Sequence, residues 1–245
     1  MLLYGYGYGY GYPMYYGFDW TYLLVLAAAV FSMWASSRVN STYQKYAQVR
    51  SMQGITGAEA ARRILYYAGL SNIRVEHVNG NLTDHYDPKS KVLRLSDSTY
   101  GSASVAAIGV AAHECGHAIQ DQEAYMPLKL RAALVPAANL GSRLGVPIII
   151  LGVILGSNYF LVQLGIWVFS LAVLFQLVTL PVEFNASNRA MNILESRGIL
   201  GQEELGMSRK VLSAAALTYV AAAASSVLQL LRLVLLYGGG RRRDD

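Results

Sequence analysis

The chain has 245 residues, of which 54% are hydrophobic and only 14% are charged, with a formal net charge of +5. A soluble domain carries about 25% charged residues, so this composition excludes an ordinary soluble domain, a disordered chain and a nucleic-acid coat. The single cysteine, Cys115, excludes an internal disulfide framework, and we expect a multi-pass membrane protein with a water-exposed part.

The N-terminal segment combines a repetitive tail with an apolar run. Residues 1–17 are rich in Tyr and Gly, have no apolar face, and are expected to be disordered. Residues 20–37 are uncharged and about as long as a helix must be to cross a hydrocarbon core of ~30 Å. A cleaved signal peptide would begin with basic residues, but the first Lys or Arg is Arg38. We therefore predict the first transmembrane helix over residues 18–37.

The polar segment that follows, residues 38–136, is expected to lie in water. Thr56 and Glu59 form the pattern of a capping box at the start of an amphipathic helix. The strand at 92–95 has two interpretations, an ordinary core strand or an edge to which an extended substrate pairs. The remaining expected elements are a strand and a helix, at residues 73–78 and 102–121.

The two later apolar runs predict the remaining membrane helices. Residues 144–182 are uncharged, and one helix of that length would reach about 58 Å, which is too long for a single crossing. A turn-like Gly-Ser-Asn sequence at 156–158 divides the run. We expect antiparallel spans over 137–156 and 160–181, with a re-entrant hairpin as the alternative. Residues 211–237 predict a fourth span or a buried helix, and their small residues suit helix packing in a membrane.

One motif carries the chemistry. The sequence His-Glu-Cys-Gly-His at residues 113–117 matches the H-E-x-x-H pattern, in which two histidines four positions apart share one helix face. His113 and His117 can therefore bind one metal ion, and Glu114 can take a proton from a water molecule beside it. Imidazole and carboxylate ligands favour Zn²⁺. A structural or inactive zinc site and a helix with incidental histidines are the alternatives.

A third protein ligand is needed. Glu123 stands where one class of zinc peptidase has a following ligand, but Gln120 replaces the glycine of that pattern. No Asp-Gly dipeptide occurs, so the ligand of the intramembrane class is absent. Glu183 follows the predicted hairpin, which returns it to the membrane face of the histidine helix, and a carboxylate there needs a partner. We expect a helix within 182–210 to supply this ligand, with an ordinary interfacial acid as the alternative.

The chain resembles the YugP-like family of neutral zinc metallopeptidases of bacterial membranes from residue 23 onward. The segments that carry the resemblance are TGAEAARRIL, LTDHYDP, LRLS, AAHECGHAIQ and PVEFNASNRA. The chain is more distantly similar to the HtpX-type and CAAX-prenyl-protease-type membrane metallopeptidases, whose glutamate ligand lies in a Glu-(Phe/Tyr)-x-Ala-Asp motif. This similarity implies that Glu183 is the ligand. Ser187 stands where the motif has Asp, and we expect Asp121 or Asn188 to orient a ligand instead.

These observations predict a mainly α, multi-pass membrane protein with about four transmembrane helices and a small α+β, zincin-like metallopeptidase part. The expected function is a membrane-embedded zinc metalloendopeptidase with a zinc-activated water and Glu114 as general base. His85, Arg189 and Tyr219 are candidates for the donor to the oxyanion. A catalytically silent zinc-binding scaffold or adaptor is the alternative, and a small transporter is a third interpretation.

The charge distribution predicts the orientation and the partners. Lys and Arg are absent before the first span and frequent after it, so the polar segment and the zinc site are expected at the cytoplasmic face of the cell membrane. The turn at 156–158 is then outside. The expected partners are membrane lipid and a protein or peptide substrate, without nucleic acid. Association with a second copy or another membrane protein stays open.

Overall fold

The computed structural model describes residues 19–237, so the expected disorder of residues 1–17 lies outside the described part. Helices and strands follow in this order: α1 Tyr22–Ala47, α2 Gly57–Tyr67, β1 Arg74–Val78, β2 His85–Asp87, β3 Val92–Ser96, α3 Asp97–Tyr100, α4 Val105–Gln122, α5 Met126–Ile154, α6 Tyr159–Ser196 and α7 Gln202–Tyr237.

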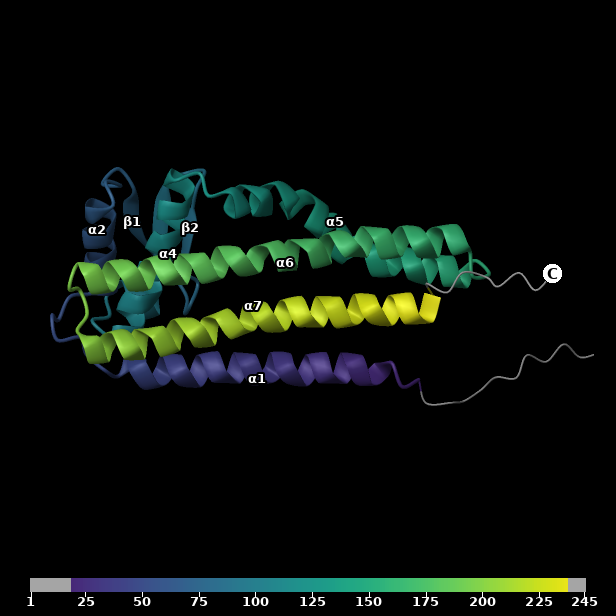
Figure 1. Ribbon diagram of the computed structural model, residues 1–245, viewed down its shortest axis with the longest axis horizontal. Helices are drawn as coiled ribbons and strands as arrows, with labels where there is room; N and C mark the ends of the chain where they lie inside the picture. Colours follow the sequence, from purple (N-terminus) through teal and green to yellow (C-terminus); the bar gives the residue numbers. More distant parts are fainter. Residues whose placement is uncertain (1–18, 238–245) are drawn as a thin grey trace, which may run out of the picture.

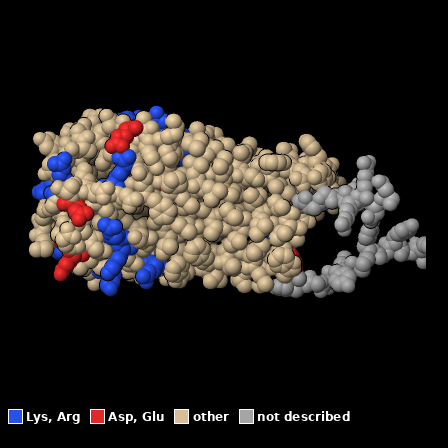
Figure 2. Space-filling view, in the orientation of Figure 1, with Lys and Arg blue, Asp and Glu red and all other residues tan. Residues whose placement is uncertain are grey.

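Four of these helices form an elongated bundle. Among the described residues, α1, α5, α6 and α7 are long and apolar enough to cross a membrane. They lie along one another, while α2, α4 and the strands gather at one end (Figure 1). Charged side chains on the face shown in Figure 2 are concentrated at that same end. The expected fold class, a mainly helical membrane protein with a small mixed part, is confirmed.

The α5–α6 hairpin accounts for the long apolar run. A short turn joins the two helices, and Gly156 takes the left-handed backbone conformation (φ 76°) that a glycine adopts without strain. Further along, the two helices pack closely, because a Cβ atom added to Gly165 would lie 2.8 Å from the carbonyl oxygen of Gly145. Helix α5 bends along its length (Figure 1) and contains Pro136 and Pro147, whose missing amide hydrogens account for such bends.

Helix α6 runs past the end of the expected third span. It continues through Pro181 to Ser196, so that Glu183 belongs to the same helix as the membrane-spanning segment. Val182 and Ala186, on either side of Glu183, are completely buried, and this packing offsets the backbone hydrogen bond that the proline cannot make. The segment 202–210 is likewise the beginning of α7 and not a separate helix. The helix that carries Glu183 is therefore a continuation of a span.

The small mixed part at the charged end contains a three-stranded sheet of order β1-β3-β2. Strand β3 pairs in parallel with β1 and antiparallel with β2, so it is central and has no free edge. The idea that residues 92–95 pair with a substrate is therefore wrong. Strand β2, which was not among the expected elements, is an edge strand. The predicted capping box is confirmed, since Thr56 and Glu59 each accept a backbone hydrogen bond from the other.

Helix α4 is the centre of this mixed part. Its N-terminus is capped by Ser104, whose hydroxyl accepts a hydrogen bond from the amide of Ala107. Two glycines allow the close approach of other helices. A Cβ atom at Gly116 would lie 2.5 Å from the carbonyl oxygen of Ala186 on α6, and one at Gly109 would lie 2.4 Å from the Ser208 hydroxyl oxygen on α7. The histidine helix is thereby held against both spans.

Candidate metal centre

His113 and His117 lie one turn apart on the face of α4 that meets α6. Their ring centroids are 4.8 Å apart, and the rings are nearly perpendicular. Both side chains are mostly buried. Because Gly116 lies between them on the sequence and has no side chain, α6 approaches closely enough to bring a third residue to the pair.

That third residue is Glu183. Its Oε2 atom lies 3.3 Å from Nε2 of His113 and 3.5 Å from Nε2 of His117. Glu183 is 2% exposed, and Oε2 is a buried oxygen without a hydrogen-bond partner. The other oxygen, Oε1, accepts a hydrogen bond of 3.0 Å from Arg131 on α5. One oxygen is thus anchored and the other is directed at the histidines.

Gln120 determines which nitrogen of His117 faces Glu183. The Gln120 amide nitrogen donates to the carbonyl oxygen of Val182 at 2.8 Å, and a carbonyl can only accept. The Gln120 oxygen is therefore the atom 3.0 Å from Nδ1 of His117, so Nδ1 must donate to it. In the neutral imidazole, Nε2 then presents a lone pair to the carboxylate of Glu183. Two acceptors at this distance require a cation between them.

The electrostatics of His117 agree with this requirement. Burial favours the neutral ring, but the carboxylates of Glu183 and Glu114 outweigh burial and raise the pKa of His117 above its ordinary value. The position between the ring and Glu183 therefore attracts positive charge, either a proton or a metal ion.

Ser187 holds the other histidine. Its hydroxyl oxygen lies 3.1 Å from Nδ1 of His113, so the residue at the Asp position of the Glu-(Phe/Tyr)-x-Ala-Asp motif contacts a candidate ligand. The expectation that Asp121 does this is wrong, because its carboxylate accepts hydrogen bonds from Tyr86 and Lys91. Asn188 lines a groove between α6 and α7, and no hydrogen bond to either histidine is found.

The three residues fit a zinc ion. Their donor atoms, two imidazole nitrogens and one carboxylate oxygen, all lie within 4.8 Å of one another. Ligand atoms about 2.0–2.2 Å from a tetrahedral zinc ion are about 3.3–3.5 Å apart, which matches the two distances to Glu183. Two histidines and one glutamate are also the ligand set of several catalytic zinc sites. The orphaned Oε2 atom gains a partner when a metal ion is present.

Glu114 lies beside this cluster and is connected to the sheet. It is buried, and its Oε2 atom accepts a hydrogen bond of 3.1 Å from the backbone amide of Tyr86 on β2. The Tyr86 hydroxyl donates a hydrogen bond to the carboxylate of Asp121 on α4. Burial of the Tyr86 side chain, together with this hydrogen bond, raises the pKa of Tyr86. The edge strand therefore fixes the orientation of the carboxylate next to the histidines.

Other candidates lie away from the cluster. Glu123 is exposed and forms an ion pair of 2.7 Å with Arg189, so it is not brought to the histidines. His85 is exposed, and its ring contacts the carbonyl oxygen of Thr83. Of the three candidate oxyanion donors, Tyr219 on α7 is close enough to interact with both Glu114 and Glu183. Cys115 is completely buried, and this burial raises the pKa of its thiol, which argues against a nucleophilic role.

Several residues of the site were missed from the sequence. Gln120 follows His117 by three positions on a helix, a spacing that places the two side chains together, and it could have been recognised. Arg131 and Tyr86 gave no such signal. Their contacts depend on the path of α5 and on strand β2, neither of which has a local pattern that points to Glu183 or Glu114.

The comparisons with known proteins agree with the geometry. The family described as "Putative neutral zinc metallopeptidase" matches residues 21–238. A protein of Bacillus subtilis (strain 168) named "Putative membrane protease YugP" is 51% identical over 198 residues, which cover 81% of this chain and 88% of that protein. No solved structure matches significantly.

Proposed function

Because this chain belongs to the family of neutral zinc metallopeptidases, we propose that it is a membrane-embedded zinc endopeptidase. His113, His117 and Glu183 hold the zinc ion in this proposal, and Glu114 is the general base. One observation carries it: the buried Oε2 atom of Glu183 has no hydrogen-bond partner and faces both histidine Nε2 atoms, with a second buried glutamate next to them.

The chain's own residues divide the work of peptide hydrolysis. A bound Zn²⁺ ion lowers the pKa of water toward ~7 and polarises a carbonyl group. Glu114 accepts the proton of the attacking water and later delivers it to the nitrogen of the leaving amine. Its Oε2 atom is engaged by the Tyr86 amide, so Oε1 is the atom that carries the proton. Gln120 and Ser187 keep the two imidazole rings in position.

Tyr219 is the proposed donor to the oxyanion of the tetrahedral intermediate. Its phenol is half-buried on α7, and both glutamates of the site lie within electrostatic range of it. A hydroxyl group in this position can donate a hydrogen bond to a developing negative charge without itself changing its charge. Arg189 is less suitable, because Glu123 and Asn185 already occupy its guanidinium group.

We place the site at the cytoplasmic face. The end of the bundle that carries the site also carries most of the basic residues on the face shown in Figure 2. At the opposite end, Arg232 is neutralised by Asp19 at 3.2 Å. An excess of unpaired Lys and Arg beside the spans is typical of the cytoplasmic side. The basic residues at one end and the neutralised Arg232 at the other both support an outside location for the α5–α6 turn.

A Glu114→Gln variant tests the proposal. The purified full chain in detergent is compared with the variant for zinc content and for cleavage of a quenched fluorescent casein. Gln keeps the size of Glu but cannot act as a base, so we expect unchanged zinc and a rate reduced by about 10²–10⁴-fold. A Glu195→Gln variant, at an exposed position of α6, is the matched control and should cleave normally. Zinc without cleavage in the unmodified chain would support the scaffold alternative.

A further inference from the structure

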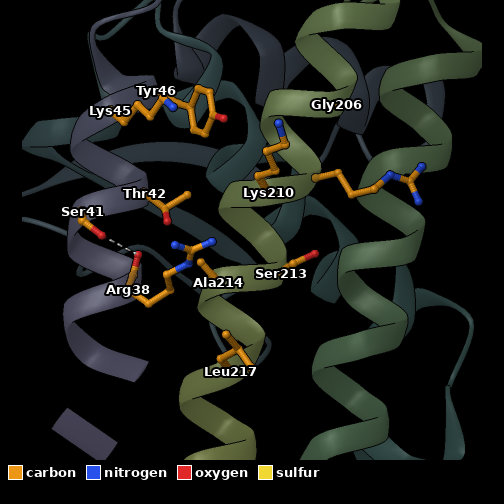
Figure 3. A pocket seen from close by; sticks show the side chains of 11 residues that line it. Arg38, Ser41, Thr42, Lys45, Tyr46, Gly206, Lys210, Ser213, Ala214 and Leu217 are labelled. Carbon is orange, nitrogen blue, oxygen red and sulfur yellow. Dashed lines mark hydrogen bonds between the residues drawn. The ribbon is translucent and has the colours of Figure 1, made fainter. Parts of the chain in front are cut away.

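A groove of about 760 Å³ lies between α1 and α7, apart from the candidate metal centre. Arg38 and Lys45 of α1 and Arg209 and Lys210 of α7 line it, and we call it the basic groove. Figure 3 shows Arg38 and Lys210 on facing sides of the space between the two helices.

The positive charge of the basic groove is not neutralised by the protein. No Asp or Glu lines the groove, and within residues 19–237 no carboxylate forms an ion pair with any of its four basic residues. All four side chains are exposed. Four unpaired cations around one cavity repel one another, so a bound anion would relieve this repulsion.

The groove lies where the two helices leave the apolar layer. Arg38 directly follows the uncharged residues 20–37, and Lys210 directly precedes the apolar part of α7. Hydroxyl groups of Ser41 and Ser213 also line the groove. Its other end is apolar, with Leu217 two turns further along α7 toward the membrane-spanning segment. The lining thus changes from cationic to apolar along the direction of the helices.

Gly206 keeps one wall of the groove open. A Cβ atom at this position would meet no atom within 4 Å, so close packing does not require a glycine here. Glycine inside a helix costs about 1 kcal/mol relative to alanine, and no contact in the fold explains that cost.

We propose that the basic groove binds the headgroup of an anionic phospholipid. A phosphate diester supplies the negative charge that Arg38, Lys45, Arg209 and Lys210 lack, and the hydroxyl group of Ser213 beside them can donate to its oxygens. The apolar end of the groove accommodates the beginning of the acyl chains. Free phosphate has the same charge chemistry, but it makes no use of the apolar end.

The test compares lipids and matched variants. The purified full chain in a non-ionic detergent is mixed with phosphatidylglycerol and phosphatidylcholine of equal chain length, and native mass spectrometry measures binding of each. We expect preferential binding of phosphatidylglycerol. Arg38→Gln together with Lys210→Gln should weaken it roughly 25-fold, at about fivefold for each basic residue. The control, Lys129→Gln with Arg143→Gln, removes the same charge from exposed positions of α5 and should change little.

Two further arms separate a built site from general attraction. Gly206→Phe keeps every cation but fills the groove, and it should abolish preferential phosphatidylglycerol binding. Inorganic phosphate should not displace the bound lipid. Three outcomes would each overturn the proposal. The first is an equal loss of lipid binding in the groove variant and the control double variant. The others are undiminished lipid binding by Gly206→Phe and displacement of the lipid by inorganic phosphate. Thermal unfolding of each variant without lipid establishes that it is folded.

Discussion

The guanidinium group of Arg131 on α5 contacts one oxygen of Glu183 at 3.0 Å, while the other oxygen of that carboxylate faces the two histidines. Arg131 is therefore the one basic side chain in an ion pair with this buried acid, apart from the histidines, within the described residues. The pair joins the start of the α5–α6 hairpin to the candidate metal centre. It also makes the stability of the protein depend on the metal in a way that can be measured.

Replacing Arg131 with Leu should destabilise the metal-free protein more than the zinc-loaded one. Without metal, the variant leaves Glu183 charged and buried without its cation. We expect the free energy of unfolding to fall by about 2 kcal/mol. This is less than the ~3–5 kcal/mol that breaking a fully buried ion pair costs, because Arg131 is partly exposed. Bound zinc compensates the carboxylate, so the loss should shrink. Thermal unfolding with zinc and with a chelator measures both values. Arg143→Leu, on the exposed side of α5, should show no such dependence on metal.

Gln120→Leu should weaken zinc binding by about 10–100-fold, the range seen when a partner that orients a ligating histidine is removed. Leu cannot accept the Nδ1 hydrogen of His117, so the ring loses its preferred orientation. Zinc retained in the presence of graded chelator concentrations gives the affinity. The control is Gln122→Leu, the same substitution at an exposed position of the same helix. If both variants retain zinc equally, the role given to Gln120 is wrong.

Gly116→Ala should lower both the unfolding temperature and the zinc content. The added Cβ atom would lie 2.5 Å from the carbonyl oxygen of Ala186, and a backbone atom cannot move aside as a flexible side chain does. Overpacking of about 1–3 kcal/mol then outweighs the better helix propensity of Ala. Gly206→Ala, where the Cβ meets nothing, should be neutral or slightly stabilising. A stable, zinc-binding Gly116→Ala variant would contradict the close packing of α4 on α6.

Cysteine labelling tests the cytoplasmic location. Single cysteines replace Lys45, Arg197 or Asn158 in a Cys115→Ala background, and intact cells are treated with an impermeant thiol reagent. We expect labelling at position 158 alone, because positive charge beside the spans is retained inside. Labelling at 45 and 197 in intact cells, with none at 158, would place the site on the other side of the membrane. The native Cys115 is completely buried and should react only after unfolding.

Local sequence patterns were sufficient to predict the long apolar helices and to recognise the histidine motif. Apolarity over about 20 residues and a spacing of four between histidines are local properties, so His113 and His117 could be assigned to one face of a helix in advance. Glu183 could be selected because a carboxylate beside a long uncharged run needs a partner. The structure brings these three side chains together.

Tertiary structure alone decided how the candidate site is supported. Strand β2 has only three residues and an Asp-Pro boundary, so its local pattern indicates a turn, and it becomes a strand by pairing with β3. Its amide then reaches Glu114. The contact between Arg131 and Glu183 depends on how α5 and α6 pack, and those helices meet where glycines leave room. A chain's local sequence specifies which faces are apolar, but contacts between distant polar groups follow only once those faces have packed.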